Sequence, residues 1–187
     1  LGDEALNDED RALQLKVRAF LEKEVKPIVN HYWNRAEFPF EIIPKLAELN
    51  ICGLTYKGYG CPGKSNLMEG ILAMEMARID TSLSTFFGVQ SGLVMGSIYL
   101  LGSEEQKQQW LPELKSLRKI GAFGLTEPEV GSAVAGGLTM KAKWNGNTWI
   151  LNGQKKWIGN ATFADVIIIR PCVGLSRQYD LLVQMCL

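Results

Sequence analysis

The spacing of hydrophobic residues predicts that the first part of the chain is helical. Between Leu13 and Ile28 apolar residues recur at intervals of three and four, the pattern of one face of an amphipathic helix. Asn7 and the three acidic residues after it suit the start of this helix, because a helix N-terminus carries a partial positive charge. We expect the helix to end around Pro27 and the polar residues that follow it.

Further helices are predicted in the middle of the chain. A short helix is expected from about Phe40 to Asn50, and Gly53 stops it. Ser65 is placed to cap the next helix, whose apolar residues fall on two faces, so we expect that helix to be buried.

The longest apolar stretch runs from Leu83 to Leu101 and has the length of a membrane span. Gln90 and several glycines and serines interrupt it, and no basic flank follows, so we interpret it as a buried helix and expect no membrane span. Ser103 and Gln106 have the spacing of a capping box at the start of a last, polar helix, which we expect to end near Pro112.

The period of the pattern changes after Lys119. Apolar and polar residues alternate on both sides of Asn145-Gly146, a dipeptide that favours the tight turn of a β-hairpin. The runs KKWIGN (155–160) and DVIIIR (165–170) are also interpreted as strands.

These patterns predict an α+β fold, with an N-terminal all-α domain followed by an incomplete antiparallel β domain. The expected divisions are a helical domain at 1–118, the start of a β domain at 119–169 and a divergent tail at 170–187. The chain has 187 residues, enough for one complete domain and part of another. It carries 20 basic and 20 acidic residues, a balance that argues against binding to nucleic acid or to an acidic membrane surface.

The cysteines and the single histidine restrict the chemistry further. No two cysteines have C-x-x-C spacing and His31 lies far from all of them in the sequence, so we expect no metal site. His31 is also not beside a nucleophile elbow, which argues against a Ser–His–Asp hydrolase. The chain begins without the pattern of a secretory signal, and we expect reduced thiols in an intracellular protein. The cysteines are Cys52, Cys61, Cys172 and Cys186.

A glycine-rich loop at 53–65 leaves an alternative open. Residues Gly58 to Ser65, GYGCPGKS, match the bare P-loop pattern, which would hold a nucleotide phosphate. A P-loop follows a buried strand, however, and the preceding LAELNICGLTYK is interpreted as helix and loop. We therefore expect a connector here, with a nucleotide binder as the weaker alternative.

The segment FGLTEPEVGS (123–132) is polar and kinked between two regular regions. Thr126 offers a hydroxyl, Pro128 fixes a turn, and Gly131 allows close approach of a phosphate to the backbone. Trp157, further along, offers an aromatic plane with an N–H group. From the residues alone, two interpretations remain open. The segment could bind a planar heterocycle that carries a pyrophosphate, or it could be a simple turn beside a buried tryptophan.

The motifs GLTEP, then GS, then LNGQKKWIGNATFAD resemble the acyl-CoA dehydrogenase and acyl-CoA oxidase flavoprotein family, from about Leu6 to Ile169. YGCPG and WIGN are similar to the branch with glutaryl-CoA dehydrogenase and short-chain acyl-CoA oxidases. The resemblance implies FAD as cofactor, acyl-CoA as substrate and a homotetramer for the full-length relative. It assigns the flavin to Phe123, Gly124, Leu125, Thr126, Gly131, Ser132, Trp157, Ile158 and Gly159, and the acyl-CoA to Ser132, Ser84 and Thr85.

The chain departs from this family at several positions. Gly159 replaces a threonine, Ala133 replaces an aspartate, and Ser84 stands where glutaryl-CoA dehydrogenase has an arginine for its dicarboxylic substrate. We therefore expect a plain acyl-CoA substrate.

In the family, a C-terminal helical bundle carries the glutamate base, and the chain leaves the family pattern at Arg170. The resemblance thus implies oxidation of acyl-CoA to 2,3-enoyl-CoA by the family, with no catalytic residue in this chain and no activity of the chain alone. The alternative is a non-catalytic paralogue that serves as an interaction module. The implied location is the peroxisome or the mitochondrial matrix.

Overall fold

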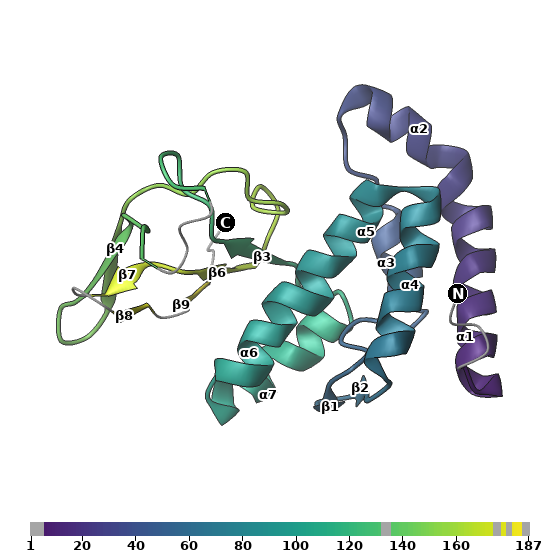
Figure 1. Ribbon diagram of the computed structural model, residues 1–187, viewed down its shortest axis with the longest axis horizontal. Coiled ribbons are helices and arrows are strands. Elements are labelled where there is room, and N and C mark those ends of the chain that lie inside the picture. The colour runs from purple at the N-terminus through teal and green to yellow at the C-terminus, as the bar shows by residue number, and fades with distance from the viewer. Residues whose placement is uncertain (1–5, 132–135, 174–176, 179–180, 185–187) are drawn as a thin grey trace.

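The computed structural model describes residues 6–131, 136–173, 177–178 and 181–184, and side-chain surroundings are described up to residue 172. A group of helices is followed along the chain by a group of strands, and the two groups lie side by side (Figure 1). This order confirms the predicted fold class. The helical segments are α1 (Asp8–Phe20), the π-helical turn η2 (Leu21–Val25), α2 (Lys26–Arg35), α3 (Ile42–Ala47), α4 (Asn66–Ile79), α5 (Thr81–Phe87), the π-helical turn η3 (Gly88–Val94), α6 (Met95–Leu101) and α7 (Glu104–Lys115).

The helix starts lie where the sequence placed them. The side chains of Asn7 and Ser65 each accept a hydrogen bond from the backbone amide three residues further on. Ser103 and Gln106 form the reciprocal capping box, with distances of 3.3 and 2.9 Å. These predictions are confirmed because a cap depends on residues within one turn of each other.

Pro27 itself does not end the first helix, which closes among the polar residues that follow it. The helical backbone continues through η2 into α2 and ends at Arg35. The amide of Lys26 donates to the carbonyl of Leu21, five residues back, so the helix widens just before the proline that lacks a donor.

Pro112 also lies inside its helix, and α7 continues to Lys115. Leu111 and Leu114 are fully buried on either side of the proline. Burying two leucines contributes about 1.5–3 kcal/mol each. Such burial offsets the roughly 3 kcal/mol that an interior proline costs.

The apolar stretch forms one continuous helical run, α5–η3–α6, through the middle of the helical domain (Figure 1). By length and composition Thr81–Leu101 is sufficient for a membrane span, with a mean hydropathy of 1.3. Half of that stretch is nevertheless buried in the protein, as in a core helix. Its buried residues include Phe86, Phe87, Val94, Met95 and Ile98.

The glycine-rich loop is a connector between α3 and α4. It contains a small hairpin of β1 (Lys57–Gly58) and β2 (Cys61–Pro62), and it follows a helix and turns. The Lys64 ammonium lies 2.6 Å from Glu9 and 3.0 Å from Asp10 of α1. Its lysine is therefore engaged by carboxylates, and the strand that a P-loop requires does not precede it.

The β part begins with β3, and its two sheets have the strand orders β3-β6-β9 and β5-β4-β7-β8. The predicted hairpin at Asn145-Gly146 is confirmed, since β4 and β5 pair antiparallel. Strand direction is mixed, however, because β3–β6 and β4–β7 pair in parallel. The strands are β3 (Gly121–Gly124), β4 (Lys141–Trp144), β5 (Trp149–Asn152), β6 (Val166–Ile169), β7 (Cys172–Val173), β8 (Arg177–Gln178) and β9 (Leu181–Gln184).

The run KKWIGN is not a strand, which corrects the sequence interpretation. Trp157 and Asn160 have φ angles of 58° and 67°, in the left-handed region that no extended strand uses. The run instead forms a loop between β5 and β6, whereas DVIIIR supplies β6 as predicted.

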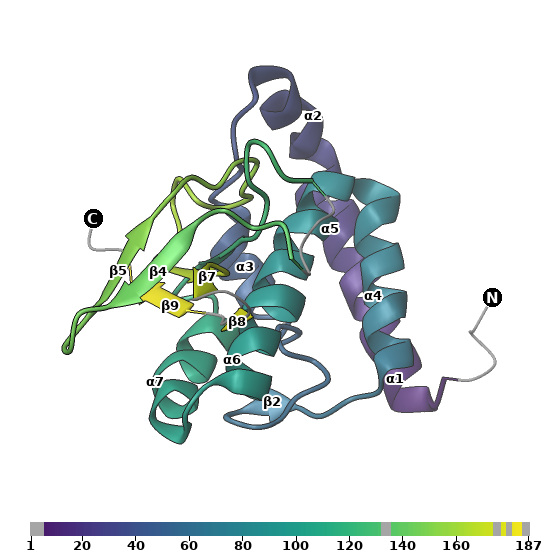
Figure 2. The same cartoon turned by 60° about the vertical axis from the view of Figure 1, so that its left-hand side comes forward.

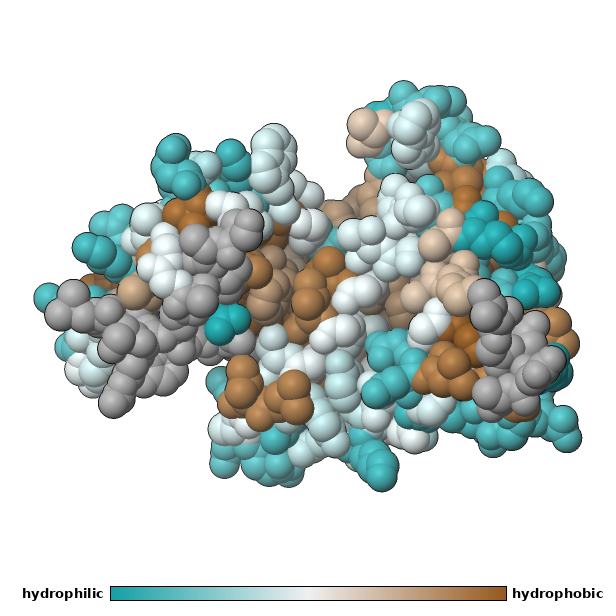
Figure 3. Space-filling model, viewed as in Figure 1, coloured by the Kyte–Doolittle hydropathy of each residue, from teal (hydrophilic) through white to brown (hydrophobic). Residues whose placement is uncertain are grey.

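Gln90 connects the helical and β parts. Its side-chain amide is fully buried, donates to the carbonyls of Leu114 and Lys119 at 2.9 Å, and accepts from the amide of Gly121 at 2.8 Å. The turned view shows the β strands beside α5 and α6 (Figure 2), and apolar residues gather where the two parts meet (Figure 3). The β part is thus fixed directly against the core helix.

Candidate functional site

The site predicted from the sequence begins where β3 ends. Gly124 is the last residue of β3, and a Cβ there would lie 2.7 Å from the Cδ1 of Ile169 in β6. A larger residue would therefore require the Ile169 side chain to shift. Beyond Gly124 the chain leaves the sheet, and Leu125 and Thr126 are half-buried.

Two buried charges lie beneath this segment. The Lys155 ammonium donates to Glu127 at 2.8 Å and to the carbonyls of Leu125 and Arg170 at 2.9 and 2.7 Å. The Lys155 side chain is 6% exposed and that of Glu127 is 0% exposed. One ammonium thus joins three segments of the β part: the junction segment, the loop before β6 and the end of β6.

The Glu127 carboxylate has further donors on its other side. It accepts from the amide and hydroxyl of Thr139, both at 2.6 Å, and from the amide of Met140 at 3.0 Å. Burial by itself raises the pKa of Glu127, but the hydrogen bonds from Lys155 and residues 139–140 outweigh it and hold the pKa at about 2. Glu127 is therefore ionised at neutral pH and turned into the β part, so it is a poor candidate for a general base.

Two distant sequence motifs meet at Thr126. The Lys156 amide donates to the Thr126 carbonyl at 2.9 Å, which places the WIGN loop beside the GLTEP segment. Trp157 follows directly and is 84% exposed, with the Lys156 ammonium 5.5 Å from its ring centroid. The two motifs of the predicted flavin site are therefore adjacent in space.

The WIGN loop also lies against the helices. A Cβ at Gly159 would lie 4.0 Å from Val89 of η3. The ring centroid of Phe163 is 5.1 Å from that of Phe38 and 5.0 Å from that of Phe40. Asn160 donates to the Gly121 carbonyl at 3.1 Å, so contacts on both sides hold the loop.

The two predicted acyl-CoA residues of α5 point in different directions. Ser84 is half-buried and its hydroxyl donates to the Ala73 carbonyl of α4 at 3.4 Å. Thr85 is exposed, and its hydroxyl donates to the carbonyl of Thr81 at 2.9 Å. Thr85 and Val89 are four residues apart and share a helix face, so Thr85 lies one turn from the contact with Gly159.

The remaining predicted residues differ in exposure. Phe123 and Ile158 are half-buried, and Gly131 is exposed with room for a Cβ on all sides. Ser132 lies outside the described residues. The Thr126 hydroxyl has no hydrogen-bond partner among the described residues, which leaves it available to a ligand.

This donor set fits a flavin in kind. An isoalloxazine ring presents amide-like polar atoms at its edge and a flat apolar face, and the segment offers a hydroxyl, half-buried apolar side chains and the exposed indole of Trp157.

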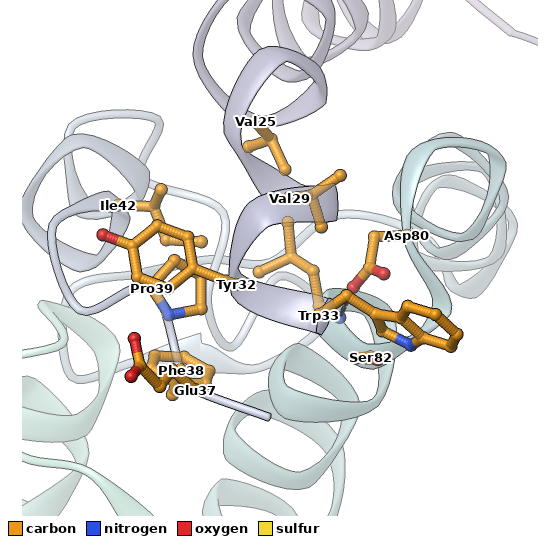
Figure 4. Close-up of a pocket in the computed structure, with 11 residues that line it drawn as sticks. Val25, Val29, Tyr32, Trp33, Glu37, Phe38, Pro39, Ile42, Asp80 and Ser82 are labelled. Carbon is orange, nitrogen blue, oxygen red and sulfur yellow. Dashed lines mark hydrogen bonds between the residues drawn. The ribbon is translucent and has the colours of Figure 1, made fainter. Parts of the chain in front are cut away.

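A separate apolar hollow lies at the other end of α5. Its volume is about 80 Å³, and α2, the segment before α3 and the start of α5 surround it (Figure 4). None of the predicted site residues lines it, although Ser82 and Leu83 come just before Ser84. The hollow is lined by Val25, Val29, Tyr32, Trp33, Glu37, Phe38, Pro39, Ile42, Asp80, Ser82 and Leu83.

Metal-binding and thiol groups are separate from this site. Among the described residues, no group of three or more His, Cys, Asp or Glu side chains is placed to hold a metal ion. Cys52 and Cys61 are free thiols, and burial raises the pKa of each. His31 is exposed, with its ring edge-on to Tyr32, as expected for a structural histidine.

Comparison with known proteins agrees with this geometry. Residues 7–118 match the family model for the acyl-CoA dehydrogenase N-terminal domain, and residues 122–178 match the middle domain. The chain belongs to the acyl-CoA dehydrogenase family. The predicted resemblance is therefore confirmed. The family consists of FAD-dependent oxidoreductases that act in fatty acid metabolism, as the sequence analysis expected.

Three relatives illustrate the match. Glutaryl-CoA dehydrogenase of Desulfococcus multivorans is 35% identical, over 87% of this chain and 43% of its own length. The mitochondrial short-chain specific acyl-CoA dehydrogenase of Mus musculus is 32% identical, over 92% of this chain and 42% of its own. A glutaryl-CoA dehydrogenase from Mycobacterium smegmatis, solved in complex with FADH2, has a TM-score of 0.92 and 38% identity, over 97% of this chain and 47% of that one. The chain thus spans less than half the length of these relatives.

Sequence reasoning missed the Glu127–Lys155 pair. It gave Glu127 no role, although the side chain is buried and faces the interior of the β part. The sequence did carry a signal, because one motif contains the acidic Glu127 and the other contains the basic Lys155. The two residues are far apart in the sequence, however, so their contact could not be inferred from it.

Proposed function

We propose that this chain forms the FAD- and acyl-CoA-binding part of an acyl-CoA dehydrogenase or oxidase. The observation that carries this proposal is the hydrogen bond between Lys156 and Thr126, which brings the GLTEP and WIGN motifs together. FAD, when bound, supplies the hydride acceptor for oxidation of acyl-CoA to 2,3-enoyl-CoA.

The residues of this chain then have distinct tasks. Phe123, Leu125 and Thr126 would line the flavin ring, with the Thr126 hydroxyl able to hydrogen-bond to it. Gly131 and Ser132 would lie on the pyrophosphate side, and Trp157, Ile158 and Gly159 would close over the other edge of the ring. The remaining residue of the flavin set is Gly124.

For acyl-CoA we propose that Ser132 lies near the thioester arm and that Ser84 and Thr85 lie at the far end of the acyl chain. Neither residue of α5 is a cation, so a distal carboxylate would find no charged partner there. This supports a plain acyl-CoA over a dicarboxylic one. A comparison of butyryl-CoA and glutaryl-CoA as ligands tests the preference, and tighter binding of glutaryl-CoA would contradict it.

We further propose that none of the residues of this chain is the catalytic base. Glu127 is buried with a pKa of about 2, and Glu129 is exposed in the same segment. A positioned base contributes about 10²–10⁴-fold to proton transfer. We therefore expect the chain alone, mixed anaerobically with short-chain acyl-CoA and excess FAD, to cause no bleaching of the flavin. Bleaching above a no-protein control would mean that a residue of this chain serves as base.

Binding of FAD is tested by titrating the purified chain and following flavin fluorescence. We expect binding weaker than micromolar, because the family relatives hold the cofactor with a protein more than twice as long. Thr126→Ala should weaken it about 5-fold, the equivalent of one lost hydrogen bond, and Ser132→Ala by a similar factor. Ser97→Ala on α6 is the matched control. Equal affinity of Thr126→Ala and wild type would remove Thr126 from the site.

For location we propose an intracellular protein of the peroxisome or the mitochondrial matrix. The mitochondrial name of the mouse relative supports the second.

A further inference from the structure

The Lys155 ammonium donates hydrogen bonds to the segment that leads into the predicted flavin site. An ammonium has three protons, and this one has three acceptors: the Leu125 carbonyl, the Glu127 carboxylate and the Arg170 carbonyl. Two of these acceptors flank Thr126 in the sequence. Both neighbours of Thr126 are therefore fixed to one buried atom.

The Thr126 backbone has a third attachment, since its carbonyl accepts from the Lys156 amide. Lys156 is the residue after Lys155, so the same loop holds the segment through a side chain and through its backbone. Glu127 in turn is anchored to residues 139–140. A frame of buried contacts thus surrounds Thr126, whose hydroxyl is proposed to bind the flavin.

We propose that Lys155 and Glu127 are positioning residues that hold Thr126 in the conformation that receives the flavin. The part of this inference that concerns the flavin rests on the proposed function. The part that concerns the ordering of residues 125–127 rests on the hydrogen-bond geometry alone. A buried ion pair is weak evidence for stabilisation, because desolvation of two charges offsets much of their attraction. Its retention beneath a ligand segment is better explained by the conformation that it imposes.

The test compares a charged pair with a neutral pair of similar volume. The variants are Lys155→Met, Glu127→Gln and the double variant, and Lys119→Met with Asp165→Asn is the matched control. That control pair is also an ammonium and a carboxylate at 2.8 Å, but it lies at the start of β3 and does not touch Leu125 or Thr126.

Two measurements are made on the full chain: the urea midpoint of unfolding and amide hydrogen exchange of residues 123–127. We expect each single variant to lower the midpoint and the double variant to recover it, because no buried charge is left unpaired. In the recovered double variant, exchange at residues 123–127 should still be at least about 10-fold faster than in wild type. A double variant with wild-type exchange would overturn the proposal.

Lys155→Arg is the second test and retains the charge. A planar guanidinium directs its donors in a fork, so it cannot reproduce the three contacts of the ammonium. We expect a folded variant with faster exchange at residues 123–127, and wild-type exchange would again refute the positioning role. FAD affinity, measured in parallel, separates the two ideas. Faster exchange with no FAD binding by wild type refutes the proposed function alone, whereas weaker FAD binding by the recovered double variant supports both.

Discussion

Glu127→Gln should change how the stability of the chain depends on pH. The Glu127 pKa is held at about 2 in the folded protein, against an ordinary value of 4.5, and its side chain is 0% exposed. A carboxyl whose pKa is lowered by folding stabilises the protein above its unfolded pKa, and this contribution is lost as pH falls toward the folded pKa. The shift corresponds to about 3 kcal/mol at neutral pH.

The assay is urea unfolding of wild type and Glu127→Gln between neutral pH and about pH 3. At neutral pH the variant should be less stable by about 3 kcal/mol, since it also leaves the Lys155 ammonium without its ionic partner. By about pH 3 wild type should have lost roughly 2 kcal/mol of this advantage, so the two curves converge. Other carboxylates titrate in both proteins and cancel in the difference. A difference that stays constant over the whole range would refute the assignment of the low pKa to Glu127.

Three further predictions follow from the described contacts. Gln90→Leu leaves the buried Gly121 amide without its acceptor and the Lys119 carbonyl without its side-chain donor, whereas the Leu114 carbonyl still accepts from the Leu117 amide; it should lower the free energy of unfolding by about 1–3 kcal/mol in urea, and a loss below about 0.5 kcal/mol would contradict this. Gly153→Ala should cost at least about 2 kcal/mol, because φ is 145° and the new Cβ would lie 2.6 Å from Met140 Cα, with Gly146→Ala as the control in open space. Ser103→Ala removes one half of the capping box and should cost about 1 kcal/mol, and an unchanged thermal midpoint would show that the cap is not needed.

The features that the sequence predicted correctly are those that depend on residues close together in the chain. Ser65 and Ser103 act on amides within one turn, and Asn145-Gly146 closes a hairpin between adjacent strands, so a short window contains the whole interaction. The order of helices and strands and the adjacency of the two motifs followed from such windows together with the family resemblance.

The errors came from interactions that a short window does not contain. Pro27 has a local propensity to end a helix, but the hydrogen bond from the Lys26 amide to the carbonyl five residues back lets the helix widen and continue past the proline. The strand propensity of KKWIGN is overridden at Trp157 and Asn160, where contacts with the helices and with Gly121 hold a left-handed backbone. The parallel pairing of β3 with β6 joins strands that are separated by a hairpin, and alternation of residues carries no information about direction.

The same distinction explains the organisation of the candidate site. Its ligand-facing residues lie in two loops, and loops have few hydrogen bonds of their own to fix them. Here the Glu127–Lys155 pair fixes the first loop from below, and Phe163 and Asn160 fix the second against the helices and β3. Gln90 then sets the position of β3 relative to the core helix that carries Thr85 and Val89. The residues that determine the site geometry are therefore buried and distant in sequence from those that face the ligand, and substitutions at Gln90, Glu127 or Lys155 should alter ligand binding without touching the ligand.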